Sequence, residues 1–532
     1  MNAEPITPEI EVERQKIEKR AKELGLDPFD TVFHMVDYKD MIQLMCYTGF
    51  PRRINHWSYG MHSIIYENQY RYGLMKVYEL VINSDPAHAY LLKNNNLLEQ
   101  KFVIGHVYAH VDFFKNNLWF KPTNRNMVSE MAWHAERADK MRKMYGDEEV
   151  EKFVDICMSL DTLIDPYSLF YNTEFESISD RVKETMKGRE QPRLIKTGNP
   201  FLDRLVNNNE YRRKEMRRIL KEEKARRKFP RKLQKDVVKF LIDNAKYMNH
   251  NLETWKVDML EMFRDEFYYF APQRLTKIMN EGWASYWHYK LMAEEGFAGN
   301  DGIFEFAKIH SGVVPLDRQQ PGPINPYSLG LQLYRWIEHR WDTGKHGLDY
   351  DKCDSLEKKL NWDTRDMKGR EKIFQVRKYY NDLLFLSEFM DQDFVDEHKL
   401  WTYGYDEFGR VIVKSKDVEP VRQALVNSIY NGGEPLVYVK DGNFNNKGEL
   451  LLYHDFDFTG KMLDIEKTLK VMRNIRSIWG RDVSIETKLP IQDKDGDIAG
   501  YADARLMCTE KSYVFYIFDE DGDVVEEREV EW

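Results

Sequence analysis

Two histidines spaced four residues apart give the strongest chemical signal in the sequence. They are His106 and His110, in the segment GHVYAHVDFFKNN. On a helix this spacing puts both imidazoles on one face, as two ligands of a single zinc or iron ion require. The zinc-protease motif H-E-x-x-H has a glutamate directly after the first histidine, where it acts as general base. Val107 occupies that position here, so the spacing predicts a metal site without the usual base.

A second group of polar residues lies in the segment MNEGWASYWH. Its Glu281, Ser285 and His288 stand at i, i+4 and i+7, and so share one face of a helix. The neighbours Trp283 and Trp287 suggest a polar site with aromatic walls. A glutamate on a later helix is a common third ligand, which predicts a divalent metal, zinc, bound by the histidine pair and Glu281. The alternative is a buried polar network that joins two helices, and both interpretations stay open.

The absence of a glutamate at position 107 means that a general base would have to come from another segment. The candidates for this catalytic role are Glu136, His134 and His288. His134 also stands four residues after Glu130 on a predicted helix, so a simple side-chain pair is the alternative there.

The loop FPRRINHWSYG, residues 50–60, combines basic and aromatic side chains. Arg53, His56 and Tyr59 are candidate substrate-binding residues, because a guanidinium and an imidazole beside an aromatic ring suit a carboxylate or a sugar. The alternative is that this loop caps the helix that follows it.

The elements that must position these residues are mostly helices up to about residue 390. Apolar and aromatic residues recur at spacings of three and four, which predicts helices at Tyr70–Ile82, Leu97–Phe114, Val237–Asn249, Glu253–Phe270 and Arg274–Glu295. The second of these helices contains the histidine pair, and the last contains Glu281 and His288.

Near residue 400 the pattern changes to short strands and turns. Predicted strands at 435–440, 449–453, 483–489, 501–508 and 513–518 alternate with helices at 418–430 and 465–479. Asp441-Gly442 and Asp521-Gly522 are typical hairpin turns. The sequence thus predicts an N-terminal helix (1–29), a helical core (30–397) and an α+β C-terminal domain (398–532).

A basic run covers Tyr211–Lys235. It has few apolar residues, which predicts a solvated helix or helical linker; the alternative is a docking site for an acidic partner or a nucleic-acid backbone. The whole chain of 532 residues has 79 Lys and Arg against 89 Asp and Glu, a net charge of -10. This balance argues against nucleic acid as the main partner.

Several other function classes lack their motifs. The sequence has no phosphate-binding loop, no dinucleotide fingerprint and no nucleophile elbow. The four cysteines are far apart, which excludes a zinc ribbon and does not favour disulfides. No segment is apolar enough for a membrane span, and the N-terminus has no apolar signal segment. We therefore expect a cytoplasmic protein without a membrane span.

Four long segments together resemble one known family. FPRRINHWSYG, GHVYAHVDFFKNN, APQRLTKIMNEGWASYWHYKLM and INPYSLGLQLYRWIEHRWD occur in this order, and the chain is similar to the stage V sporulation protein R (SpoVR-like) family. The resemblance implies a role in spore cortex formation, or in stress and stationary phase in bacteria that form no spores. It also implies two partners, a serine-kinase-like protein and a von Willebrand-type domain protein.

The order of the two metal-site segments is also similar to that of the gluzincin metallopeptidases. His106, His110 and Glu281 match the three ligands of that arrangement, and Val107 departs from it. We expect a mainly α-helical N-terminal body with zincin-like helices, followed by a smaller α+β C-terminal domain. The leading hypothesis is a metal-dependent hydrolase acting on a peptide or amide, such as a cell-wall precursor. The alternative is a non-enzymatic scaffold that binds the kinase-like protein.

Overall fold

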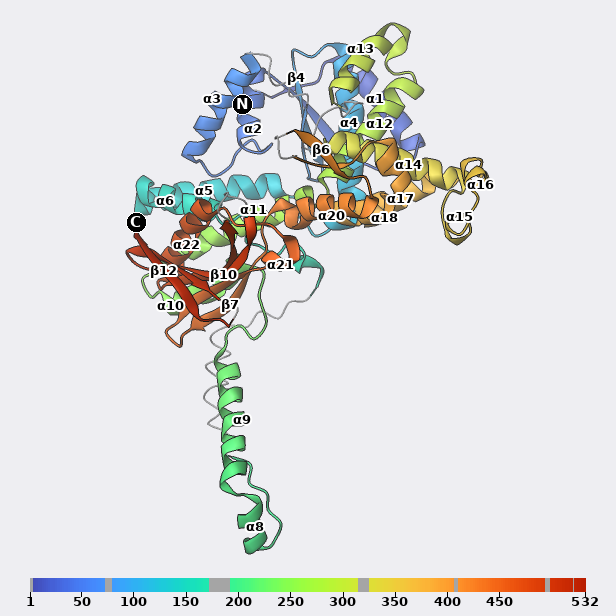
Figure 1. The fold of residues 1–532 in the computed structure, drawn as a ribbon. Helices are drawn as coiled ribbons and strands as arrows, with labels where there is room; N and C mark the ends of the chain where they lie inside the picture. The colour runs from blue at the N-terminus through green and yellow to red at the C-terminus, as the bar shows by residue number, and fades with distance from the viewer. Residues whose placement is uncertain are drawn as a thin grey trace. The chain divides into compact units, whose positions relative to one another are not determined.

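The computed structural model describes residues 3–71, 79–171, 192–313, 325–405, 410–492, 498–519 and 521–532. The chain forms two compact units, the first made of Met1–Asp147 and Tyr268–Gly433, the second of Glu148–Phe267 and Glu434–Trp532 (Figure 1). Each unit therefore combines two separate stretches of the chain. Helix α11 (Thr254–Leu275) contributes residues to both units.

The first unit contains a four-stranded sheet of order β1-β2-β4-β3. Strands β2 (Thr31–Val36) and β4 (Ala87–Leu92) run parallel, and β1 (Glu4–Pro5) and β3 (Glu79–Ile82) pair antiparallel with them. The sequence predicted a helix over Tyr70–Ile82, and this prediction is wrong for the four residues of β3. A short apolar run suits a helix and a strand equally well, and pairing with β4 decides the outcome.

Helices form most of the remainder of the first unit. Their bounds are α1 (Pro8–Glu23), α2 (Tyr38–Cys46), α3 (Trp57–Arg71), α4 (Leu97–Asn116), α5 (Met127–Tyr145), α12 (Lys277–Tyr289), α13 (Gly299–Val313), α14 (Pro326–Thr343), α15 (Leu348–Asp351), α16 (Leu356–Leu360), α17 (Gly369–Tyr379), α18 (Asp382–Phe389), α19 (Gln392–Glu397) and α20 (Val418–Ile429). After residue 400, strand β5 (Thr402–Tyr405) pairs antiparallel with β6 (Val411–Ser415).

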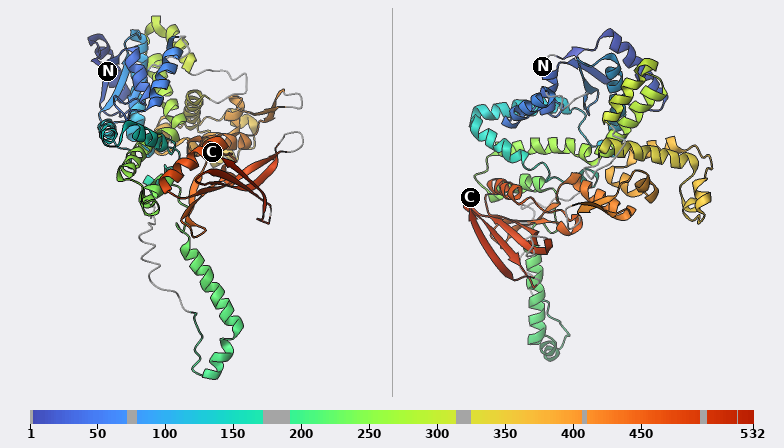
Figure 2. Two further views of the ribbon diagram at one scale, coloured as in Figure 1. Left: turned by 90° about the vertical axis from the view of Figure 1, so that its left-hand side faces the viewer. Right: turned by 45° about the horizontal axis from the view of Figure 1, so that its top comes forward.

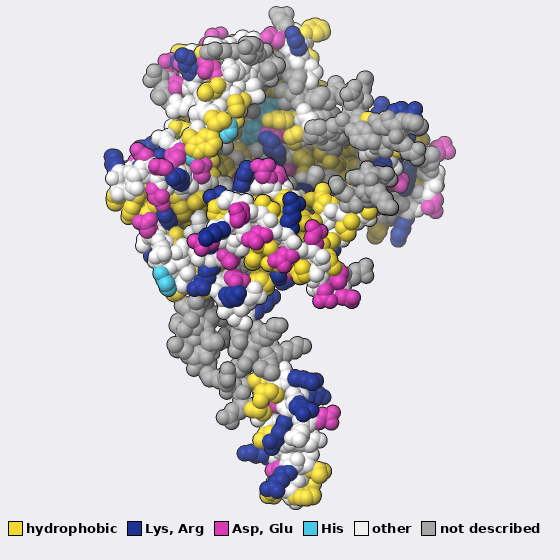
Figure 3. Space-filling model, turned by 60° about the vertical axis from the view of Figure 1, so that its left-hand side comes forward, with side chains coloured by type: hydrophobic (Ala, Val, Ile, Leu, Met, Phe, Trp, Pro, Cys, Tyr) yellow, Lys and Arg dark blue, Asp and Glu magenta, His cyan; other side chains and the backbone are white. Residues whose placement is uncertain are grey.

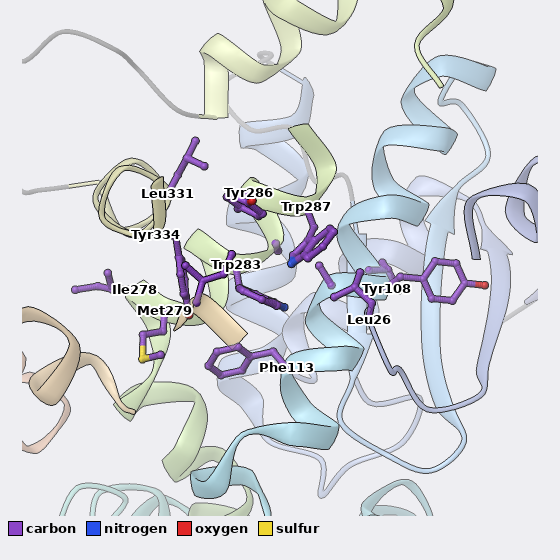
Figure 4. Close-up of a cluster of buried hydrophobic side chains, with 14 of the residues drawn as sticks. Leu26, Tyr108, Phe113, Ile278, Met279, Trp283, Tyr286, Trp287, Leu331 and Tyr334 are labelled. Carbon is purple, nitrogen blue, oxygen red and sulfur yellow. The ribbon is translucent and has the colours of Figure 1, made fainter. Parts of the chain in front are cut away.

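Helix α12 packs against both α4 and α14. Where it meets α14, a Cβ on Gly282 or on Gly330 would lie against the backbone of the other helix, so only glycine permits this close approach. Phe113 of α4, Trp283 and Trp287 of α12 and other buried side chains fill the surrounding core (Figure 4). Burying a large side chain of this kind contributes about 1.5–3 kcal/mol, so this core fixes the spacing of α4 and α12.

The second unit contains a six-stranded sheet of order β12-β11-β10-β9-β8-β7 (Figure 2). The strands are β7 (Val437–Phe444), β8 (Glu449–His454), β9 (Val483–Gln492), β10 (Ile498–Cys508), β11 (Ser512–Phe518) and β12 (Val524–Glu531). Only β8 and β9 pair in parallel, and the connection between them includes α21 (Phe456–Thr459) and α22 (Ile465–Trp479), of which α22 contacts the sheet. The unit also contains α6 (Asp147–Met158), α8 (Pro200–Val206), α9 (Asn209–Arg227) and α10 (Val237–Met248).

The expected fold class is confirmed in that a mostly helical body precedes a C-terminal region with a sheet. The zincin-like character of the metal-site helices stays a prediction. Asp521-Gly522 lies in the turn between β11 and β12, as predicted, whereas Asp441-Gly442 lies inside β7 and is not a hairpin turn. The proposed boundaries at residues 29 and 397 stay predictions. Among the described helices, none has the length and apolar character needed to cross a lipid bilayer.

Candidate metal centre

The two histidines lie on the buried part of α4. This helix begins at a capping box, in which the Asn96 side chain accepts the Glu99 N–H and the Glu99 carboxylate accepts the Asn96 N–H. Further along the helix, His106 is 2% exposed and His110 is 5% exposed. Two polar rings buried among apolar side chains need partners from another element, and α12 supplies them.

The N-terminus of α12 is fixed by a carboxylate from a distant helix. Asp382, at the start of α18, accepts the backbone N–H groups of Ile278 and Met279, both at 2.8 Å. Burial raises the pKa of Asp382 to about 7, although these two hydrogen bonds act in the opposite direction. A second buried contact joins α12 to α4, since the Trp283 indole donates to the Asp112 carboxylate at 2.9 Å. These contacts set the position of Glu281 opposite the histidines.

Three possible ligand atoms converge between α4 and α12. Glu281 Oε2 lies 3.5 Å from His110 Nε2 and 3.9 Å from His106 Nε2. Two ligands held tetrahedrally about 2.1 Å from a zinc ion would be roughly 3.4 Å apart, so these separations are close to those of a coordinated set. The buried group His106, His110 and Glu281 could hold a metal ion, and it is the one such group of three among the described residues.

Hydrogen bonds on the far side of each ring orient the two imidazoles. His110 Nδ1 donates to the Asn280 side-chain oxygen at 2.9 Å, which leaves the lone pair of His110 on Nε2, toward Glu281. His106 Nδ1 lies 2.8 Å from His288 Nδ1, and either ring can be the donor. In known metal sites the ligand histidines make such a second hydrogen bond, which fixes the ring and its tautomer.

Burial keeps these imidazoles in the uncharged form that binds metals. It holds the pKa of His106 and of His288 well below the ordinary value for histidine. Burial also lowers the pKa of His110, although the nearby Glu281 carboxylate acts in the opposite direction. Since a protonated imidazole has no lone pair to donate, these shifts keep both candidate ligands available at neutral pH.

A lysine is the third partner of the carboxylate. Lys277 Nζ lies 2.7 Å from Glu281 Oε1, one helical turn away, and its side chain is 56% exposed. This ion pair occupies one carboxylate oxygen and directs the other toward the histidines.

The hydrogen-bonded chain continues beyond His288. His288 Nε2 lies 2.9 Å from His310 Nδ1 on α13, and burial lowers the pKa of His310 to about 4. Sequence reasoning assigned no role at this centre to Lys277, Asn280 or His310. Asn280 precedes Glu281 directly and could have been considered with it, whereas the 22-residue separation of His310 from His288 gave no signal.

The other candidate catalytic residues have different surroundings. Glu136 on α5 is exposed and forms an ion pair with Lys140 at 2.8 Å. His134, on the same helix, is buried with its ring centroid 5.8 Å from that of Trp133. His288 is the one of the three whose ring contacts His106.

The candidate substrate-binding residues lie together at the start of α3. His56 Nδ1 accepts the Ser58 N–H at 3.3 Å in the first turn of the helix. This contact fits the alternative interpretation, in which the loop caps the helix. The Arg53 guanidinium lies 5.9 Å from the centroid of the Tyr59 ring and donates to the Thr48 hydroxyl at 2.5 Å. A substrate role for Arg53, His56 and Tyr59 stays a prediction.

Comparison with known proteins agrees with the resemblance seen in the motifs. The family model described as "SpoVR like protein" matches residues 6–434, and the chain therefore belongs to the SpoVR-like family. It is also similar to the uncharacterized protein YcgB of Escherichia coli (strain K12), with 26% identity over 512 residues, which cover 92% of this chain and 93% of that protein. No solved structure matches the chain.

Proposed function

We propose that His106, His110 and Glu281 bind a zinc ion, and that the centre hydrolyses a peptide or amide bond, such as one in a cell-wall precursor in the cytoplasm. The observation that supports this proposal is the direction of the rings: both Nε2 atoms face one oxygen of Glu281. Two imidazoles and a carboxylate are a ligand set typical of zinc, and three protein ligands are typical of catalytic rather than structural zinc sites.

Bound zinc would polarise the substrate carbonyl and lower the pKa of a coordinated water. The residues of the chain have supporting tasks. Asn280 and His288 hold the two imidazoles, and Lys277 orients the carboxylate of Glu281. Val107 is fully buried and offers no proton acceptor. Of the proposed bases Glu136, His134 and His288, the last contacts His106 on the side away from Glu281, where it holds the ring and does not face the proposed metal position.

Metal analysis tests the zinc site. The purified full chain, dialysed against zinc and then buffer, is compared with a His106→Ala/His110→Ala variant by elemental analysis. The matched control is His34→Ala/His88→Ala, which removes another pair of histidines in mutual contact, 3.1 Å apart on β2 and β4. We expect about one zinc per chain in the wild type and the control, and almost none in the first variant. Equal zinc in all three proteins would disprove the site.

Hydrolysis needs a separate measurement. The zinc-loaded chain is incubated with a set of dipeptide amides and a soluble cell-wall precursor peptide, with the His106→Ala/His110→Ala variant as the blank. Release of amine or ammonia above this blank is the expected result. One bound zinc with no release would refute the hydrolase and retain the metal centre. It would leave the second candidate, a scaffold for a serine-kinase-like protein and a von Willebrand-type domain protein, which the family resemblance supports.

A further inference from the structure

Residues 192–218 of the second unit, here called the arm, have large apolar side chains on their surface. Helix α8 has the sequence PFLDRLV, and its four large apolar residues lie on one face. Phe201 is 73% exposed and Leu205 65%, and Leu202 and Val206 are exposed as well. Leu194, Ile195 and Met216 add exposed apolar surface in the same segment. An amphipathic helix whose apolar face meets water is characteristic of a binding surface.

The same segment is strongly basic. It contains eight Lys and Arg residues against three Asp and Glu, a net charge of +5 in a chain whose net charge is -10. Among the cations, the consecutive residues Arg212, Arg213 and Lys214 of α9 are all exposed. Lys and Arg side chains and hydrophobic side chains appear together on the surface of this segment (Figure 3).

The arm is folded, so its apolar surface does not result from a lack of structure. The Asn207 side chain accepts the Ile195 N–H at 2.9 Å and donates to the Ile195 carbonyl at 2.9 Å. The Tyr211 hydroxyl donates to the Arg193 carbonyl at 3.0 Å, and the Asp203 carboxylate accepts the Thr197 N–H at 2.6 Å. Internal polar contacts therefore fix the loop against both helices while Phe201 and Leu205 point into solvent.

We propose that the arm binds the surface of an anionic lipid membrane, with the apolar face of α8 inserted at the level of the headgroups. Apolar side chains of this type enter the boundary between headgroups and acyl chains, and neighbouring Lys and Arg are attracted to anionic lipids. A nucleic acid would use the cations but leave the apolar face of α8 in water. A lipid surface satisfies both features at once.

Vesicle flotation of the full chain tests the proposal. Vesicles of phosphatidylcholine alone are compared with vesicles containing equal parts of phosphatidylcholine and phosphatidylglycerol, at low and at high salt. Two variants are used: Phe201→Asp/Leu205→Asp removes the apolar face, and Arg212→Glu/Arg213→Glu/Lys214→Glu reverses the charge. The matched controls are Leu348→Asp/Leu360→Asp, which changes two exposed leucines of the first unit, and Lys467→Glu/Lys470→Glu/Lys511→Glu on other surfaces of the second unit.

The expected result is flotation of the wild type and both controls with anionic vesicles only. Each arm variant should bind the anionic vesicles at least about tenfold more weakly than the wild type. High salt should reduce vesicle binding of the wild type. Circular dichroism checks that every variant is folded. Absence of flotation at low salt, or equal flotation of the arm variants and their controls, would overturn the proposal. Salt-sensitive binding to polyglutamate or duplex DNA without vesicle binding would overturn it too, and would assign the arm to an acidic macromolecule.

Discussion

The candidate metal centre and the arm deviate from the usual distribution of side chains in opposite directions. The centre places imidazoles and a carboxylate in the interior, while the arm places phenylalanine and leucines in water. Buried polar groups and exposed apolar patches are the two kinds of deviation that point to function. The centre depends on contacts between residues as distant as His106 and His288, 182 positions apart. The arm is held by contacts within about 20 residues.

The largest effect that we predict comes from separating the helices that form the centre. Gly330→Ala places a Cβ against the carbonyl of Ile278 on α12, and a backbone atom cannot move aside as a side chain can. We expect a loss of about 3 kcal/mol or more in the free energy of unfolding, measured by urea denaturation. Gly60→Ala is the control, since a Cβ there meets no atom within 4 Å. A Gly330→Ala variant as stable as the wild type would show that α12 and α14 do not pack this closely.

The second largest effect is a loss of zinc affinity when the hydrogen-bond partners of His106 and His110 are removed. His288→Phe keeps the ring but removes the hydrogen bond to His106, and Asn280→Ala removes the acceptor of His110. Each should weaken zinc binding by about 10- to 100-fold, as loss of such partners does in known sites. The dissociation constant is measured by competition with a chelating dye.

The control for this pair is His454→Phe, which changes a buried histidine of the second unit whose partner is Thr487. It should leave zinc affinity unchanged. Thermal melting identifies variants that fail to fold. If one of the two variants fails to fold, the other still tests the prediction. Zinc affinity within twofold of the wild type in both folded variants would mean that the hydrogen bonds from His288 and Asn280 do not contribute to zinc binding.

A smaller effect, of the opposite sign, is expected at Lys277. Its ammonium group beside Glu281 repels any cation that binds there. Because the lysine is more than half exposed, the repulsion is screened, and Lys277→Gln should tighten zinc binding only about two- to fivefold. Lys290→Gln is the control, since it breaks another i,i+4 pair, with Glu294 at 2.9 Å, in the helical turn directly after α12. Weaker zinc binding in Lys277→Gln would show that the orientation of the carboxylate by Lys277 matters more for zinc binding than the repulsion of the cation.

The contrast between contacts close in the sequence and contacts between distant residues explains how much of the structure could be predicted. The four-residue spacing of His106 and His110 and the helix Ile465–Trp479 are local patterns, and the structure has them where they were expected. The β3 strand at Glu79–Ile82 could not be recognised, because its conformation depends on pairing with β4. Glu281 was proposed as the third ligand because a glutamate on a later helix is a common one, and the order of the segments in the gluzincins agreed with this. The Lys277–Glu281 pair has the local spacing of one helical turn, whereas the contact of His310 with His288 is set by tertiary packing.

The smallest effect that we predict is on the stability of the arm. In Phe201→Asp/Leu205→Asp both substituted side chains already lie in water, so the free energy of unfolding should change by less than about 0.5 kcal/mol. The interior comparison is Leu331→Ala, at a fully buried position of α14, which should cost about 2–5 kcal/mol. Urea denaturation measures both. A large loss of stability in the arm variant would mean that Phe201 and Leu205 pack within the protein, and the arm would then follow the usual distribution of side chains.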